Sequence, residues 1–133
     1  MELQLVAQPS AARAGRHWVM TAVRAQGVPE DALDVIELLT GELLANAVVH
    51  GPDAGEILIR TWRSGRVINV AVTDESIDRP VVSMPAPTSS GGRGMLLVDT
   101  LSSDWGVDDG VAGGKTVWFS LDVGAARPAG RTG

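Results

Sequence analysis

Residues 41–51 read GELLANAVVHG, and this stretch decides how the rest of the chain is interpreted. From residue 38 to residue 49 the sequence is almost entirely apolar, yet it carries a carboxylate at Glu42 and a carboxamide at Asn46. A polar group buried without a hydrogen-bond partner is costly, and a carboxylate more so. Either these two side chains satisfy each other, or a ligand meets them.

Glu42 and Asn46 are four residues apart, so on a helix they project from the same face. The neighbouring Leu38, Ala45 and Val49 argue against full solvation of this face. A carboxamide oxygen can coordinate Mg²⁺ and a carboxylate can accept a proton, which gives the pair a functional interpretation. The alternative is a solvated Asn–Glu pair at a helix edge, and the two residues alone leave both open.

Periodicity and turn residues outline the remaining elements. We expect Ser10 to be the N-cap of a first helix, Gly27 to follow its end, and Pro29 to open the second helix. The expected helices are 10–27, 29–50 and 94–102, and the expected strands are 2–7, 55–62, 66–74, 104–107 and 115–123. This order predicts an α+β fold, a two-layer sandwich with a mixed, mostly antiparallel sheet covered by helices on one face.

The domain organisation is expected to be simple. Residues 1–123 form one domain, residues 75–92 are rich in Pro, Ser and Gly and suit a lid, and 124–133 form a disordered tail. The strand at Leu3–Val6 pairs either within the sheet or across a homodimer, and the sequence leaves both open.

Composition excludes several classes of function. The 133 residues carry a net charge of -5, and the eleven Lys and Arg residues are scattered, which argues against nucleic acid as a partner. No apolar run is long enough to span a membrane, no signal peptide is evident, and the absence of cysteine excludes disulfides. We therefore expect a cytoplasmic protein.

Two glycine-rich stretches resemble nucleotide-binding motifs and fail on inspection. Gly113–Thr116 resembles the end of a phosphate-binding P-loop, but Asp109 stands where the first glycine is required and a strand follows instead of a helix. Gly92–Gly94 resembles a dinucleotide fingerprint, but Leu97 replaces its third glycine.

A different set of residues survives in a fixed order. Asp74 ends a strand, Gly91–Gly94 precede a helix whose free amides could face a phosphate, and Thr116 begins the closing strand. Taken singly, these are ordinary turn, loop and strand residues. Together with Glu42 and Asn46 they resemble the Bergerat-fold ATP-binding domain of gyrase, Hsp90, MutL and histidine kinases.

Within that superfamily, the chain looks like the bacterial anti-sigma-factor serine/threonine kinases. The segments GELLANAVVHG, VAVTDES and GRGMLLVDTLSSDWGV are similar to that branch, and the resemblance covers roughly residues 8–122. The superfamily often has glycine where this chain has Ser76, and a second lid glycine is also missing near Arg79.

The resemblance implies a role for each motif residue. Asn46 would coordinate the Mg²⁺ that bridges ATP phosphates, Glu42 would be the general base, and Asp74 would bind the adenine amine with Thr116 in support. The remaining nucleotide-binding residues implied are Ser76, Gly92, Arg93, Gly94 and Met95.

The implied function is transfer of the γ-phosphoryl group of ATP to an anti-sigma-factor antagonist, with sequestration of a sigma factor. A catalytically silent ATP-binding module is the alternative. A detached histidine-kinase ATPase domain is disfavoured, because neither His17 nor His50 lies in a helical hairpin that could carry an acceptor histidine.

Overall fold

The computed structural model describes residues 1–50, 55–75, 93–109 and 114–124. The elements, in chain order, are β1 (Glu2–Val6), α1 (Pro9–Ala25), α2 (Glu30–His50), β2 (Glu56–Ser64), β3 (Val67–Asp74), α3 (Arg93–Leu101), β4 (Asp104–Asp109) and β5 (Lys115–Asp122). This confirms the predicted α+β order. Residues 76–92 of the predicted lid and 125–133 of the predicted tail lie outside the described residues.

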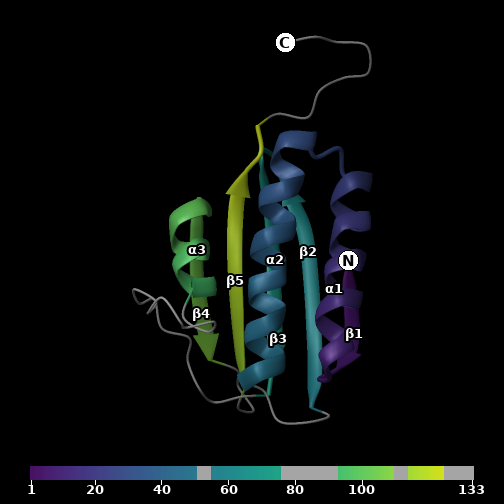
Figure 1. Ribbon diagram of the computed structural model, residues 1–133. Coiled ribbons are helices and arrows are strands. Elements are labelled where there is room, and N and C mark those ends of the chain that lie inside the picture. Colours follow the sequence, from purple (N-terminus) through teal and green to yellow (C-terminus); the bar gives the residue numbers. More distant parts are fainter. Residues whose placement is uncertain (51–54, 76–92, 110–113, 125–133) are drawn as a thin grey trace.

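The strands form one five-stranded sheet in the order β1-β2-β3-β5-β4 (Figure 1). Every neighbouring pair is antiparallel, so the parallel component expected from the sequence does not occur among the described strands. Strand β1 pairs with β2 of its own chain, with Leu3 opposite Ile59. Of the two pairings left open for this strand, the structure shows the one within the sheet.

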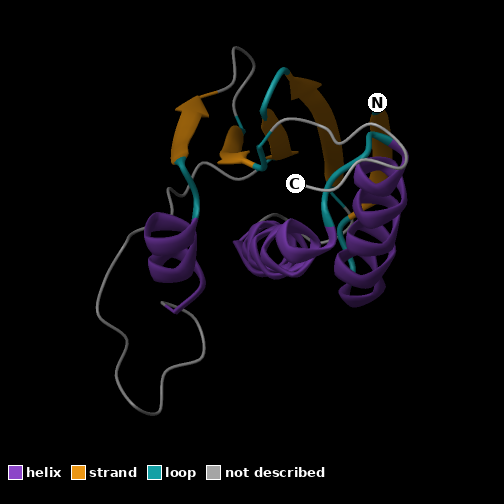
Figure 2. Ribbon diagram, turned by 90° about the horizontal axis from the view of Figure 1, so that it is seen from above, coloured by secondary structure: helices purple, strands orange, loops and turns teal. Residues whose placement is uncertain are grey.

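The three helices of the described residues all cover the same face of the sheet, and none of them lies on the other face (Figure 2). Strand β2 shows the consequence in its alternation. Ile57 and Ile59 face the helices and are fully buried, whereas Trp62 on the opposite face is 42% exposed. The hydrophobic core therefore lies between helices and sheet, and includes Val19, Leu44 and Phe119, each with no solvent exposure.

The first helix begins one residue before the predicted start. Its N-cap is Gln8, whose side chain makes no capping hydrogen bond, and Pro9 occupies the first turn. Ser10 is therefore inside the helix and the predicted cap is wrong. Proline suits the first helical position because its missing N–H is not needed there and its φ is already helical. Gly27 follows the helix end with φ +76°, as predicted.

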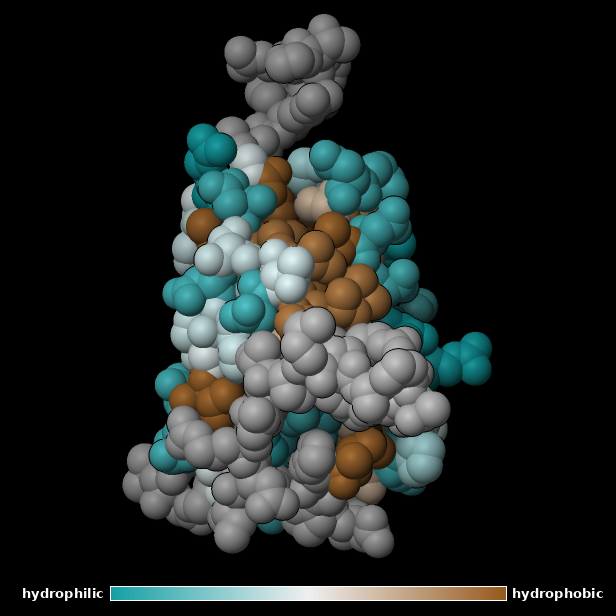
Figure 3. All heavy atoms as spheres, turned by 60° about the vertical axis from the view of Figure 1, so that its left-hand side comes forward, coloured by the Kyte–Doolittle hydropathy of each residue, from teal (hydrophilic) through white to brown (hydrophobic). Residues whose placement is uncertain are grey.

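Some apolar surface stays in contact with solvent. On the side of the molecule where α3 and β4 come forward, apolar side chains gather between hydrophilic margins (Figure 3). Leu101, at the end of α3, is 39% exposed. None of the described helices has the length and apolar character needed to cross a membrane.

The topology brings several predicted site segments to one end of the molecule. Strand β3 ends there, β5 begins there, and α2 reaches its carboxyl end beside them (Figure 1). Helix α2 contacts β3, β5 and α3. A site built from the end of α2 and the β3–β5 edge is therefore possible within one chain.

Candidate functional site

Glu42 and Asn46 do not satisfy each other in the structure. The Oδ1 atom of Asn46 is buried and has no hydrogen-bond partner among the described residues. Glu42, one turn earlier on α2, is half-buried and forms no hydrogen bond or ion pair within the described part of the chain. A buried carboxamide oxygen without a partner is uncommon in native proteins and indicates a missing ligand or water.

Glu42 and Asn46 are both half-buried, so this helix face is not fully solvated, as expected, but its apolar residues are exposed. Leu38 is 41% exposed and Val49 is 74% exposed, and Ala45 is also exposed. Glu42 lies at an open groove of about 540 Å³ between helices α1 and α2, lined also by Arg16, Glu37 and Leu38. A group from outside the protein can therefore reach the Glu42 carboxylate.

Asp74 is buried at the end of β3 and forms an ion pair. It is 3% exposed, and Lys115 directly opposite it on β5 is 1% exposed. The Nζ atom of Lys115 donates to both carboxylate oxygens of Asp74, at 3.2 Å to Oδ1 and 3.1 Å to Oδ2. The Asp74 carboxylate, to which the family resemblance assigns the adenine amine, is therefore bound through both of its oxygens by one ammonium group.

Gly114 allows this close approach. It has φ +79°, and a Cβ at this position would lie 2.5 Å from the main-chain oxygen of Asp74. A residue with a side chain would meet both backbone strain and a collision, so glycine is required here. The tight contact brings the start of β5 against the end of β3 and places Lys115 beside Asp74.

Thr116 is not brought to Asp74. It pairs with Thr73 on the helix-free face of the sheet, and the two hydroxyl oxygens are 2.7 Å apart. Successive residues of a strand point to opposite faces, so Lys115, not Thr116, shares a face with Asp74. Sequence reasoning missed Lys115, although it is the only lysine in the chain and alternates with the core residues Val117 and Phe119.

The other predicted nucleotide contacts are only partly described. Met95 is 3% exposed and belongs to the hydrophobic core. Arg93 and Gly94 are the first two residues of α3, whereas Ser76 and Gly92 lie outside the described residues. The described geometry therefore supports a site centred on α2 and on the β3–β5 edge.

Comparison with protein families decides the class of this chain. Residues 5–121 match the family of histidine kinase-like ATPase domains. The chain belongs to this family. The region that carries Glu42, Asn46 and Asp74 is therefore a histidine kinase-like ATPase domain. A comparison with curated proteins gave no match.

Solved structures share the fold of this ATPase domain at low sequence identity. The structure of the RsbU and RsbW domains of Rv1364c from Mycobacterium tuberculosis aligns with a TM-score of 0.64 and 20% identity, over 100% of this chain and 35% of that chain. A histidine kinase domain from Erythrobacter litoralis aligns with a TM-score of 0.56 and 23% identity, over 84% of this chain and 61% of that one. The catalytic domain of the histidine kinase ThkA gives 0.55 and 13%, over 92% and 96%.

The polar groups of this ATPase domain fit a magnesium–nucleotide complex. The described residues contain no cluster of three or more His, Cys, Asp or Glu side chains that could hold a metal. Mg²⁺ rarely needs one, because it keeps several waters and binds substrate phosphates through few protein ligands. The Oδ1 atom of Asn46, which has no hydrogen-bond partner among the described residues, is a carbonyl oxygen of the kind that coordinates Mg²⁺.

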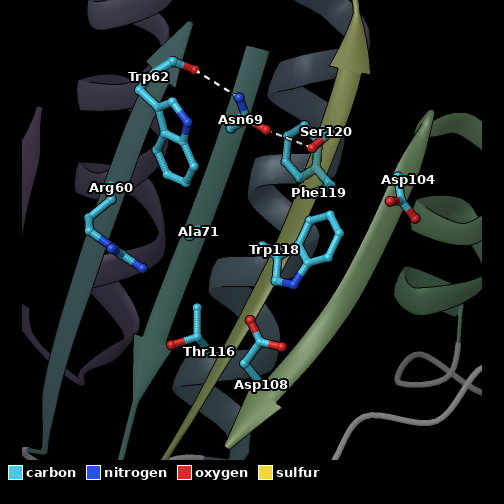
Figure 4. A pocket seen from close by; sticks show the side chains of 10 residues that line it. All are labelled: Arg60, Trp62, Asn69, Ala71, Asp104, Asp108, Thr116, Trp118, Phe119 and Ser120. Atoms are coloured by element: carbon cyan, nitrogen blue, oxygen red, sulfur yellow. Dashed lines mark hydrogen bonds between the residues drawn. The ribbon is translucent and has the colours of Figure 1, made fainter. Parts of the chain in front are cut away.

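The helix-free face of the ATPase domain carries a separate pocket (Figure 4). It has a volume of about 380 Å³, and the indoles of Trp62 and Trp118 stand on either side of Ala71. The Nε atom of Arg60 is buried at this pocket without a hydrogen-bond partner among the described residues. Of the predicted site residues only Thr116 lines it, so it lies across the sheet from Asp74.

Proposed function

We propose that this domain binds ATP with Mg²⁺ and transfers the γ-phosphoryl group to a serine or threonine of a partner protein. The carrying observation is the pair on α2: a buried Asn46 oxygen with no hydrogen-bond partner among the described residues, one turn from a Glu42 carboxylate that solvent can reach. A domain that only binds nucleotide can use the Asn46 oxygen as a metal ligand, but it does not need the accessible carboxylate of Glu42.

The side chains divide the chemistry between them. Asn46 would hold the metal through Oδ1, and Asp74 would accept a hydrogen bond from the adenine amine. Glu42 would take the proton of the attacking hydroxyl. At the same time a bond would form between the hydroxyl oxygen and the γ-phosphorus, and the bond from that phosphorus to the bridging oxygen of the β-phosphate would break. When bound, Mg²⁺ supplies charge neutralisation on the phosphates.

A protein substrate fits the open groove at Glu42. The groove between α1 and α2 offers Arg16, Asp34 and Glu37 as polar contacts around the carboxylate, and it is wide enough for a side chain from another molecule. The likeness to a structure that contains an RsbW domain supports a role in partner switching. We propose an anti-sigma-factor antagonist as the phosphorylated partner and a sigma factor as the sequestered one, in a cytoplasmic protein that can also pair as a homodimer.

Glu42→Gln tests the proposed base. The substitution keeps the shape of the side chain and removes its ability to accept a proton, so phosphoryl transfer and slow ATP hydrolysis should both fall about 100-fold or more. In hydrolysis, water replaces the hydroxyl, which allows the measurement without the partner. ATP affinity, measured by calorimetry, should stay within about threefold.

Glu37→Gln is the matched control, since Glu37 lines the same groove from the same helix. It should leave hydrolysis and affinity unchanged. If the Glu42 variant hydrolyses ATP at the wild-type rate, Glu42 is not the base and the domain is a nucleotide-binding module.

A further inference from the structure

The only lysine of the chain is one of its most buried residues. All ten other basic side chains are arginine, and Lys115 is 1% exposed. Lysine is rarely fully buried unless it is paired. Its partner Asp74 is equally buried, on the neighbouring strand and in direct register. The ion pair lies at the point where the proposed function places the adenine ring.

Burial of this ion pair costs desolvation free energy that an apolar pair would not. Two charges removed from water lose hydration that their mutual attraction only partly returns, and an apolar pair of similar volume is often as stable or more so. Neighbouring positions on the helix-facing side are apolar, namely Val72 on β3 and Val117 on β5. Stability alone therefore does not account for a lysine and an aspartate here, and a task involving a ligand does.

The geometry suits one task in particular. Lys115 donates to both oxygens of Asp74 at nearly equal distances, which fixes the plane of the carboxylate. A carboxylate accepts hydrogen bonds at about four lone-pair positions, more than the two contacts that Lys115 makes. We propose that Lys115 is a specificity-determining residue of the nucleotide site, where it holds Asp74 as an acceptor for the exocyclic amine of adenine.

This inference rests on the proposed function and explains its base selectivity. Adenine presents an amine donor at the position where guanine presents a carbonyl oxygen. A carboxylate accepts from the amine and repels the carbonyl oxygen. Without the lysine, the Asp74 carboxylate would lose the two hydrogen bonds that fix its orientation toward the base. Lys115 therefore sets which base the pocket accepts.

The first test compares three nucleotides on the wild-type protein and on Lys115→Met, by calorimetry. The nucleotides are ATP, GTP and the triphosphate of purine riboside, which lacks the exocyclic amine. Wild type should prefer ATP to the amine-free analogue by about 10-fold or more, the range of a hydrogen bond to a charged group. In Lys115→Met this preference should fall to about threefold or less, and the preference for ATP over GTP should narrow. Circular dichroism checks that the variant is folded.

Arg66→Met is the matched control. It removes a cation from an exposed ion pair at 3.5 Å between Arg66, the residue before β3, and Asp122 at the end of β5. It should leave the ratios between the three nucleotides unchanged. If Lys115→Met keeps the wild-type ratios, or loses GTP binding while retaining the preference for the adenine amine, the proposal is overturned.

A second test needs no variant. Because the chain has one lysine, labelling lysine with ¹⁵N at Nζ gives a single side-chain ammonium signal. We expect ATP to shift this signal, and the amine-free analogue to shift it much less at equal saturation. A signal that does not respond to bound ATP would contradict the proposal even if Lys115→Met fails to fold.

The outcomes separate this inference from the function beneath it. If wild type binds no ATP, the proposed function fails and the inference fails with it. If wild type binds ATP but the lysine signal and the nucleotide ratios do not depend on Lys115, the nucleotide site stands and only the role of Lys115 is withdrawn.

Discussion

The buried pair of Asp74 and Lys115 changes how a mutation at the adenine site must be interpreted. Asp74→Asn is the obvious way to test adenine binding, but it leaves the Lys115 ammonium buried with no opposite charge 3.1 Å away. Loss of ATP binding in that variant would then have two causes, namely loss of the acceptor and loss of the fold. The stability of the variant has to be known before its affinity is interpreted.

We expect Asp74→Asn or Lys115→Met to lower the free energy of unfolding by about 3–5 kcal/mol, because each leaves one buried charge unpaired. The double variant Asp74→Asn/Lys115→Met should recover most of the loss. Arg66→Met, in the exposed pair with Asp122, should cost about 0–1 kcal/mol. Urea unfolding measures all four. Equal effects at the buried and exposed pairs would mean that the Asp74–Lys115 contact is not formed in solution.

Asn46 carries the second prediction at this scale. Its unpartnered Oδ1 should be the protein's ligand to Mg²⁺, so Asn46→Ala should remove most of the effect of Mg²⁺ on ATP affinity. The chain's other asparagine, Asn69, lies on the helix-free face and provides the control. Calorimetry with and without Mg²⁺ decides the matter, and a Mg²⁺ effect that survives in Asn46→Ala would show that the metal is held elsewhere.

At the scale of elements, two glycines show how tightly the helix layer is packed. A Cβ on Gly15 of α1 would lie 2.6 Å from Cδ1 of Ile59 and 2.9 Å from Cδ1 of Leu44, both fully buried side chains. A Cβ on Gly41 of α2 would meet only the Arg16 side chain, at 3.6 Å. Helix α1 therefore approaches the core closely at Gly15, and α2 has room at Gly41.

Alanine at these two positions should have opposite effects on stability. Gly15→Ala should lower the free energy of unfolding by up to about 2 kcal/mol, because overpacking costs about 1–3 kcal/mol and helix propensity returns at most about 1. Gly41→Ala should raise it by up to about 1 kcal/mol, since only the propensity changes. Thermal or urea unfolding gives both values. A stabilised Gly15→Ala would show that α1 is not seated as described.

The same scale shows what the sequence could and could not predict. The number and order of the elements followed from periodicity, and the hairpin of β2 and β3 followed from its turn residues. The role given to Thr116 shows what alternation leaves undecided. Trp118 and Phe119 are both large and apolar on opposite faces of β5, so the pattern did not show which face meets the helices. Gly114 and the register with β3 place Lys115 on the face of the sheet that the helices cover.

At the scale of the whole molecule, the sheet separates two environments. The helix-covered face carries the buried Asp74 and Lys115, and the opposite face carries the pocket between Trp62 and Trp118. The order of the motifs along the chain identified the family, because the Glu42–Asn46 helix, Asp74 and the later glycines follow one another as they do in that family. It could not place Glu42 at an open groove, since that exposure depends on how α1 packs beside α2.

Titration of the wild-type protein with ATP, in the presence and absence of Mg²⁺ and with GTP as the control, tests the central claim most directly. We predict saturable binding of one ATP, strengthened by Mg²⁺, and no comparable binding of GTP. A wild-type protein that is folded but binds neither nucleotide would contradict both the site at α2 and the β3–β5 edge and the kinase function built on it.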